Sequence, residues 1–416
     1  MFSKTRALWK SIGPGLVVGA SDDDPSALAS YSLAGARYGY AMLWVLVFML
    51  PFMVALQEMS ARIGALSGCG LAGNLKRHYP KFFLLLVAII MVLTNTLNIG
   101  ANIYGMAGGL NLVLPIPIQA LALILSAIIL ILVIFLDYEQ ITNLFKWVAL
   151  SLFAYVFAFF MVKANWSSLI FHSIIPSFSF NRNYILLLFA VIGTSFSPYL
   201  YFWQASEEAE GVRLNKPRIR VCKFRTVSAG TLQRMELDTK LGMLFSNLIS
   251  FFVIALTAAT IFQGGNPSES LRDIAQALQP IAGQYAYLLF TIGLLGSGLL
   301  SIPVLAGSAA YVVSEIFGWE AGFNKHLAHA KEFYCVVIAS IAAGLFIPFL
   351  GIAPLQALYY TSILNGLITP ILIVFVIHMA NNKDIVGPYA TKPVFNYLGI
   401  ISFFIMITGT IYVFVS

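Results

Sequence analysis

The chain has 416 residues, of which 59% are apolar and only 10% are charged. Soluble domains carry about 25% charged residues, and a soluble fold of this length could not bury so much apolar surface. The composition therefore indicates a protein that exposes much of its surface to lipid. The net charge of +7 would suit a nucleic-acid partner, but the positions of the basic residues favour membrane loops.

Eleven segments are apolar over the roughly 20 residues that a spanning helix needs. The predicted spans are 12–36, 41–64, 82–110, 117–136, 143–163, 184–205, 241–262, 285–316, 332–350, 355–380 and 394–416. The longest loop, about 206–240, is too short for a soluble domain. The chain is therefore predicted to be all-α, with residues 1–416 forming a single transmembrane domain.

Lys and Arg predict the orientation, because cytoplasmic loops carry an excess of them. With the N-terminus inside, 20 of the 24 fall in cytoplasmic segments. The four on the other side are Arg37, Lys163, Arg182 and Arg272. We therefore expect an inner or plasma membrane protein with a cytoplasmic N-terminus and an extracellular C-terminus. The basic stretch 213–225 is interpreted as a cytoplasmic loop, with attraction to anionic lipid as a secondary effect.

The three cysteines, Cys69, Cys222 and Cys335, are scattered and form no CxxC spacing. We therefore expect neither a disulfide framework nor a thiolate metal site. The first apolar segment has no small-residue cleavage site and runs into charged residues, so no cleaved signal peptide is expected.

Proline interrupts two of the predicted spans, the first at Pro25 and the sixth at Pro198. In a bilayer the carbonyl groups freed by proline need partners, so such breaks persist where they are buried or line a wet cavity. Helices one and six correspond in a five-plus-five inverted repeat, which is typical of the LeuT-type transporter architecture. We expect repeats at 12–163 and 184–380 and an extra helix at 394–416. Two independent proline kinks are the alternative.

Three consecutive carboxylates, Asp22, Asp23 and Asp24, lie at the first break. An Asp at the membrane centre costs about 2.5–3.5 kcal/mol on insertion scales, so such residues are functional by default. A cation is their natural partner. Asp24, beside the proline, is the strongest candidate ligand, and Asp22 and Asp23 are candidates for a vestibule or for indirect contact with the ion.

The other candidate ligands in the two breaks are also oxygen atoms, from Ser26, Thr194, Ser197 and freed carbonyl groups. Hard oxygen ligands suit magnesium, calcium and manganese, whereas sulfur and imidazole select softer metals. Magnesium dehydrates reluctantly. The pattern favours a roomy acidic site around a largely hydrated ion.

The first helix resembles that of the NRAMP divalent-metal transporters, whose pattern is Gly-Pro-Gly, eight residues, and Asp-Pro-Gly-Asn. The spacing here is the same, from Gly13 to Ala27, and residues 39–44 and 60–64 of the second helix are similar to the family as well. The resemblance covers most of the chain. It implies metal binding by the Asp and Asn of the first motif and by an Ala carbonyl and a Met sulfur of helix six.

At those four positions this chain has Asp24, Ala27, Thr194 and Ser197, so the sulfur ligand is lost. Tyr199 stands where the family has a His after the helix-six proline. These departures make the sequence most similar to the NRAMP-related magnesium transporter branch. That resemblance implies transport of hydrated magnesium, and also manganese, without proton coupling.

Two family acids in helix three, on the proton route, appear here as Asn95 and Asn98. Asn365 in helix ten is a further candidate ligand, because family members use a polar residue in that helix. An interhelical hydrogen bond is the alternative for Asn365.

We therefore expect an alternating-access carrier of Mg²⁺ and Mn²⁺ that needs no cofactor, binds no nucleic acid and works as a monomer in the lipid bilayer. It is not expected to be an enzyme, because no nucleophile–base pair, P-loop or dinucleotide motif is present. The alternatives are a proton-coupled Mn²⁺ or Fe²⁺ symporter of ordinary NRAMP type, a carrier of organic solutes, and a receptor that binds metal without transporting it.

Overall fold

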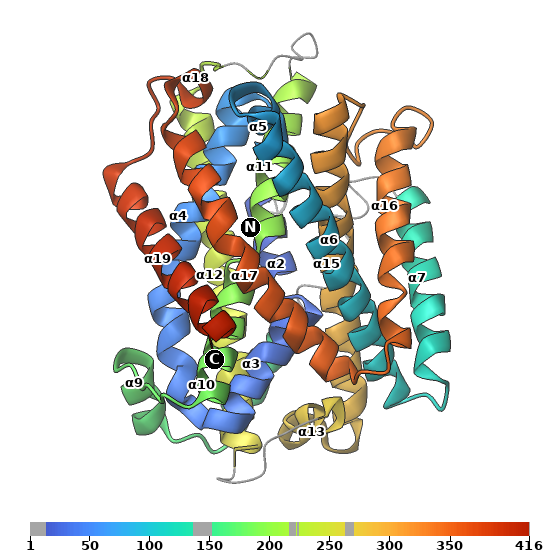
Figure 1. Ribbon diagram of the computed structural model, residues 1–416. Coiled ribbons are helices and arrows are strands. Elements are labelled where there is room, and N and C mark those ends of the chain that lie inside the picture. Colours follow the sequence, from blue (N-terminus) through green and yellow to red (C-terminus); the bar gives the residue numbers. More distant parts are fainter. Residues whose placement is uncertain (1–13, 136–151, 216–221, 223, 263–269, 416) are drawn as a thin grey trace, which may run out of the picture.

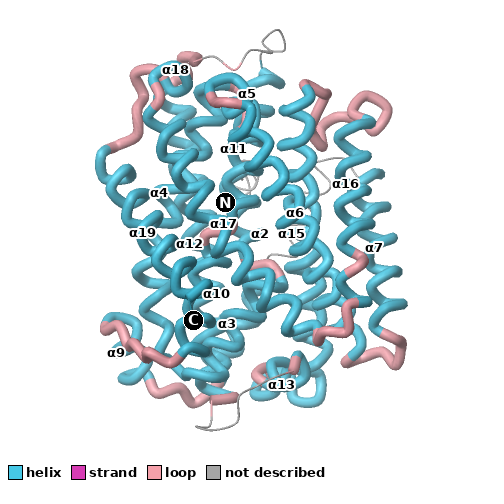
Figure 2. The backbone as a smooth tube through the Cα atoms, in the orientation of Figure 1, coloured by secondary structure: helices cyan, strands magenta, loops and turns pink. Residues whose placement is uncertain are grey.

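The computed structural model describes residues 14–135, 152–215, 222, 224–262 and 270–415, and these residues form helices and their connections without any strand (Figures 1 and 2). The all-α prediction is confirmed. The long helices run between two ends of the molecule. We call them the α5 end, which also carries α18, and the α13 end, which also carries α9 (Figure 1).

The helices are α2 (Pro14–Asp22), α3 (Pro25–Tyr38), α4 (Leu43–Ser67), α5 (Leu71–His78), α6 (Lys81–Asn111), α7 (Ile118–Phe135), α9 (Trp166–Ile174), α10 (Arg182–Ser195), α11 (Pro198–Asn215), α12 (Ala229–Thr260), α13 (Leu271–Gln276), α14 (Gln279–Ala282), α15 (Ala286–Phe317), α16 (Lys331–Gly344), α17 (Pro354–Asn381), α18 (Lys383–Val386) and α19 (Pro393–Val415). Short 3-10 turns are η1 (Gly39–Met42), η2 (Gly283–Tyr285) and η3 (Ile347–Phe349).

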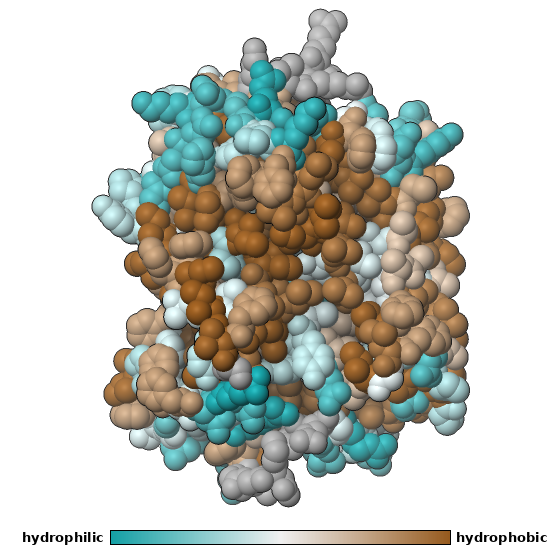
Figure 3. Space-filling model, in the orientation of Figure 1, coloured by the Kyte–Doolittle hydropathy of each residue, from teal (hydrophilic) through white to brown (hydrophobic). Residues whose placement is uncertain are grey.

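Within the described ranges, nine helical stretches are long and apolar enough to cross a membrane. One of them, Pro25–Ser67, contains both α3 and α4, and the shorter helix Leu152–Met161 is the described portion of the predicted span 143–163. Residues 143–151 of that span lie outside the described residues. Each predicted span thus coincides with a helix, and an apolar band separates two polar ends (Figure 3). The chain is a multi-pass membrane protein.

Both predicted breaks are present. Helix α2 ends at Asp22 and α3 begins at Pro25, while α10 ends at Ser195 and α11 begins at Pro198. A proline at the first position of a helix costs no hydrogen bond, because an N–H at that position would have no partner inside the helix. Each proline therefore fixes the start of the second half-helix, and the residues before it are left outside the helical ladder.

Helix α12 begins earlier than predicted, at Ala229 rather than near residue 241. The hydropathy pattern detects the portion embedded in lipid, whereas the first turns are polar. Ser228 caps this extension, and its side chain accepts a hydrogen bond from the Thr231 N–H at 3.2 Å. A polar helix start with its own cap continues into water without an apolar signal in the sequence.

A charge cluster attaches this extension to α4. Arg62 Nε pairs with Glu58 Oε1 at 3.1 Å, and the Arg62 guanidinium also contacts Glu236 of α12. Lys392, just before α19, bonds the second Glu236 oxygen at 3.1 Å. The Glu58 side chain is fully buried, so these cations compensate a carboxylate that water does not reach.

Helix α2 lies against α12 in very close contact. A Cβ atom on Gly19 would lie 2.0 Å from the backbone oxygen of Gly242, and one on Gly15 would lie 2.6 Å from the Thr239 nitrogen. The Gly15 N–H also donates to Asp238 Oδ2 at 2.7 Å. Because no side chain fits between these backbones, α2 packs directly against the backbone of α12.

Cys69 and Cys222 are joined by a disulfide bond, with their Cα atoms 5.3 Å apart. The expectation that the cysteines stay unpaired was therefore wrong for these two, although Cys335 is free and exposed. The paired residues are 153 positions apart in the sequence. Such a pairing has no local motif, because it depends on how the end of α4 meets the segment before α12.

Candidate cation site

Asp24 sits in the first break and caps the N-terminus of α3. Its Oδ1 accepts hydrogen bonds from Ser26 Oγ at 2.6 Å and from the Ala27 N–H at 2.8 Å. Its Oδ2 accepts a hydrogen bond from Asn102 Nδ2 of α6 at 3.0 Å. The helix dipole favours a carboxylate at this position. Three of the predicted site residues, Asp24, Ser26 and Ala27, are thus in direct contact.

The second break is built on hydroxyl groups. Ser197 Oγ donates to the Thr194 carbonyl at 2.6 Å, and Thr194 Oγ1 has no hydrogen-bond partner among the described residues. The Tyr199 hydroxyl donates to the Ser21 carbonyl at 2.8 Å. This bond joins the two breaks, because Ser21 lies in the last turn of α2 and Tyr199 in the first turn of α11.

Helix α17 contacts both breaks. Ser362 Oγ bonds the Ser26 carbonyl at 3.1 Å, and Thr369 Oγ1 donates to the Phe196 carbonyl at the same distance. Thr369 thus satisfies a carbonyl group that the second break leaves free, whereas the Ser26 carbonyl belongs to the first turn of α3. The sequence pattern had indicated freed carbonyls but not which helix would supply their donors.

Three amides follow one another along α6. Asn102 bonds Asp24, Asn98 Nδ2 donates to Asn365 Oδ1 at 2.7 Å, and Asn95 Nδ2 donates to Ser308 Oγ at 2.6 Å. The structure thus places Asn365 in an interhelical hydrogen bond with Asn98, while the donors to the Asp24 carboxylate are Ser26, Ala27 and Asn102. Sequence reasoning missed Asn102, although its spacing from Asn98 puts it one turn further along the same face.

Asp22 and Asp23 turn toward α12 instead. Ser246 Oγ donates to Asp22 Oδ2 at 2.6 Å, and Ser250 Oγ donates to Asp23 Oδ1 at 2.9 Å. Both serines were missed from the sequence, although they lie one turn apart in a predicted span. The three carboxylates therefore diverge, and no group of three acidic, His or Cys side chains in the described ranges could hold one metal ion.

All three carboxyl groups are buried, with exposed fractions of 0–1%. No described basic side chain forms an ion pair with Asp22, Asp23 or Asp24. Uncompensated carboxylates at membrane depth are costly. The region between the two breaks therefore offers buried carboxyl oxygens that no cation of the protein compensates, and a bound cation would compensate them when they are ionised.

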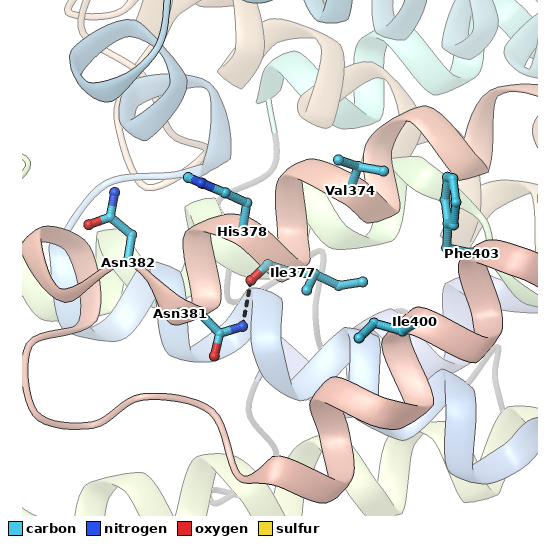
Figure 4. A pocket seen from close by; sticks show the side chains of 7 residues that line it. All are labelled: Val374, Ile377, His378, Asn381, Asn382, Ile400 and Phe403. Atoms are coloured by element: carbon cyan, nitrogen blue, oxygen red, sulfur yellow. Dashed lines mark hydrogen bonds between the residues drawn. The ribbon is translucent and has the colours of Figure 1, made fainter.

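A groove of about 580 Å³ lies elsewhere, between α17 and α19 (Figure 4). Its lining residues are Val374, Ile377, His378, Asn381, Asn382, Ile400 and Phe403. Four of the seven are apolar, and Asn381 turns its amide back to the Ile377 carbonyl at 2.8 Å. None of the predicted ligands lines this groove, so it is separate from the region between the two breaks.

Comparisons with known proteins were made for the sequence and for the fold. The sequence matches the family described as natural resistance-associated macrophage protein-like (Nramp) over residues 15–416. A divalent metal cation transporter MntH from Caldanaerobacter subterraneus subsp. tengcongensis is 23% identical over 415 residues, which covers 96% of this chain and 92% of that protein. The MntH of Bacillus subtilis is 24% identical over 393 residues, covering 92% and 86%.

Two solved structures are similar to this fold. A manganese transporter of Eremococcus coleocola, in complex with an aromatic bis-isothiourea substituted compound, has a TM-score of 0.69 at 17% identity and covers 96% of this chain and 86% of its own. A nucleobase-cation-symport-1 family transporter in a closed conformation has a TM-score of 0.58 at 13% identity, covering 96% and 90%. The predicted transporter fold with two broken helices is therefore confirmed.

Proposed function

Because the chain belongs to the Nramp family, we propose that it transports divalent cations, Mg²⁺ and also Mn²⁺, as largely hydrated ions. The membership confirms the resemblance seen in the first helix. The observation that carries the proposal is the oxygen chemistry around the two breaks, where Asp24, Ser26, Thr194 and Ser197 offer carboxylate, hydroxyl and carbonyl groups. Such ligands favour hard cations.

The contacts of Asp24 support an ion that keeps much of its water. Both carboxylate oxygens already accept hydrogen bonds, from Ser26, Ala27 and Asn102. A bare ion would have to displace some of these donors, whereas a hydrated ion can approach through water. Thr194 Oγ1, which has no partner within the described ranges, is then free to receive a hydrogen bond from a metal-bound water molecule.

We further propose that the ion passes by alternating access, with the monomer as the working unit. Basic residues place the α5 end and the N-terminus in the cytoplasm and the C-terminus outside. The contact of α2 with α12 then closes the cytoplasmic side, and release of the ion needs α2 to leave α12. A potential of 100 mV would assist entry of a doubly charged ion by about 4.6 kcal/mol, at about 2.3 kcal/mol per charge.

The groups at three positions support transport without protons. Asn95 and Asn98 cannot carry a proton in the physiological range, and Tyr199 replaces a titratable imidazole. The second candidate is a proton-coupled carrier of Mn²⁺ or Fe²⁺. Its manganese substrate agrees with the name of one relative of known structure, a manganese transporter.

Uptake of Mg²⁺ and Mn²⁺ into proteoliposomes, with internal pH recorded in parallel, tests the proposal. We expect flux of both ions without acidification. Manganese flux with acidification and without magnesium entry would establish the second candidate instead. Saturable binding without any flux would identify a receptor.

Asp24→Asn provides the matched variant, because it keeps the shape of the side chain and removes its charge. We expect uptake to fall to the background of empty vesicles while the melting temperature stays close to that of the parent protein. Uptake at the parental rate would show that the Asp24 carboxylate is not needed for transport.

A further inference from the structure

We propose that Asp22 and Asp23, together with Ser246 and Ser250 of α12, form a second cation site that is distinct from the one at Asp24 and takes a hard divalent ion. The inference relies on the proposed function for the class of ion, but not for any flux. The two carboxylates come from the first break, and the two hydroxyl groups from one face of α12. The side-chain oxygens of these four residues meet where the end of α2 faces α12.

Each of the two carboxyl groups has one oxygen without a hydrogen-bond partner among the described residues. Each has one oxygen bonded to a serine, at 2.6 Å for Asp22 and 2.9 Å for Asp23. The other oxygens, Asp22 Oδ1 and Asp23 Oδ2, are buried and have no hydrogen-bond partner in the described part of the chain. A buried acceptor without a partner is costly. Two of them on adjacent residues indicate that a positive ligand belongs there.

A third helix supplies independent evidence. The hydroxyl group of Tyr201, in α11, is also buried and also without a hydrogen-bond partner among the described residues. It lies close enough to Asp22 for the charge of that carboxylate to act on it. A buried hydroxyl group that lies near a carboxylate and bonds to none of the described residues offers a further oxygen ligand. The oxygen set thus comes from three separate elements.

Charge selects a divalent ion. When ionised, Asp22 and Asp23 contribute two negative charges, and no described basic side chain pairs with either. One divalent ion compensates both, whereas a monovalent ion leaves one buried charge uncompensated. The ligands are carboxylate and hydroxyl oxygens, which suit Mg²⁺, Ca²⁺ and Mn²⁺. Asp24 does not join this set, because its oxygens are bonded to α3 and to Asn102.

The position of the site gives the ion a structural consequence. Asp22 is the last residue of α2, and Ser246 lies one turn beyond Gly242, which α2 touches at Gly19. An ion held between them would tie the end of α2 to α12. Its departure would leave two repelling carboxylates at that junction and would favour separation of the two helices.

The test is a count of bound Mn²⁺ per chain, made on the full-length protein in lipid nanodiscs. The electron paramagnetic resonance signal of free Mn²⁺ is followed during titration, in a buffer with choline in place of sodium. We expect two ions in the parent protein and one in Asp24→Asn. The double variant Asp22→Asn with Asp23→Asn should also bind one, and adding Asp24→Asn should remove it.

Serine variants keep the carboxylates and protect the test from misfolding. Ser246→Ala with Ser250→Ala should lower the affinity for one of the two Mn²⁺ ions by about tenfold, because two hydroxyl groups that act as ligands and hydrogen-bond donors are lost. Ser126→Ala is the matched control. It is a buried serine of α7 that bonds its own helix at Ala122, and it should change neither ion.

The outcomes separate this inference from the proposed function. One ion in the parent protein, lost in Asp24→Asn and unaffected by the Asp22 and Asp23 changes, would overturn the second site and leave the transport proposal intact. Loss of all binding in both sets of variants would show a single shared site and would also overturn it. Displacement of one ion by sodium alone would refute its divalent character.

Discussion

Gly19→Ala tests whether the contact between α2 and α12 holds the closed conformation. The added methyl carbon would lie 2.0 Å from the Gly242 carbonyl oxygen, against at least 3.4 Å in an ordinary contact, so the two backbones must part by about 1.4 Å. Overpacking of this kind costs about 1–3 kcal/mol. If the cost falls on the closed conformation alone, the equilibrium shifts toward separated helices by about 5- to 150-fold.

Hydrogen–deuterium exchange in lipid nanodiscs measures this shift. Amides of residues 15–22 should exchange faster in Gly19→Ala by up to that factor, because exchange through local opening follows the population of the open state. Amides of α7 should be unaffected. The control is Gly230→Ala at the start of α12, where nothing lies within 4 Å of the added carbon.

The control receives the same gain in helix propensity, up to about 1 kcal/mol, without the clash. Unchanged exchange of α2 in Gly19→Ala would refute the reasoning. It would mean that the two helices accept the methyl group without separating, and that their contact does not set the conformation of the protein.

Three further predictions concern the packing around the site. Arg62→Met should destabilise the protein by about 3–5 kcal/mol, because it leaves the buried Glu58 without its closest cation, and a lower melting temperature would show it. Asn98→Leu should change manganese uptake little, because interhelical hydrogen bonds in membranes contribute about 0.6 kcal/mol on average. Cys69 and Cys222 should be reduced in the cell, because their end of the molecule is the one that we place in the cytoplasm, where thiols are kept reduced. Maleimide labelling of the protein after denaturation, which exposes the buried Cys69, should then count three thiols before the cells are treated with an oxidant and one after it.

Each of the three predictions has a control or a result that would contradict it. Lys240→Met should cost less than about 1 kcal/mol, because Lys240 is exposed and lies 3.8 Å from Glu236, and an equal loss in both variants would contradict the burial argument. Uptake reduced tenfold in Asn98→Leu would show that the amide does more than join helices. Cys335, which is exposed, should label under all conditions, and a single labelled thiol in untreated cells would show that the bridge is closed in the cell.

The sequence predicted the helical architecture because lipid imposes a length and a composition on every span, and proline marks a break wherever the ladder is interrupted. It predicted Asp24 as a ligand because an acid at membrane depth beside such a break is costly, and the structure shows that Asp24 also caps α3. It did not identify Asn102, Ser246 or Ser250, since Asn and Ser are common in membrane helices and their importance depends on the helix they face.

The direction of each carboxylate was also beyond the sequence. Asp22, Asp23 and Asp24 are consecutive, and they look like one acidic cluster in the printed chain. The end of α2 and the start of α3 point them to different neighbours, so that two face α12 and one faces α6. Adjacent residues diverge because the helix stops between them, and no periodicity rule describes that turn.

The bond between Cys69 and Cys222 has a topological consequence. When it is closed, it makes a covalent ring of the chain from α5 to α11, while α2, α3, α4 and everything from α12 onward stay outside the ring. A single backbone cut inside the ring then leaves one continuous molecule. In the oxidised protein the end of α4 therefore stays tied to the segment before α12, and the separation of the two helices is limited by the length of residues 222–229.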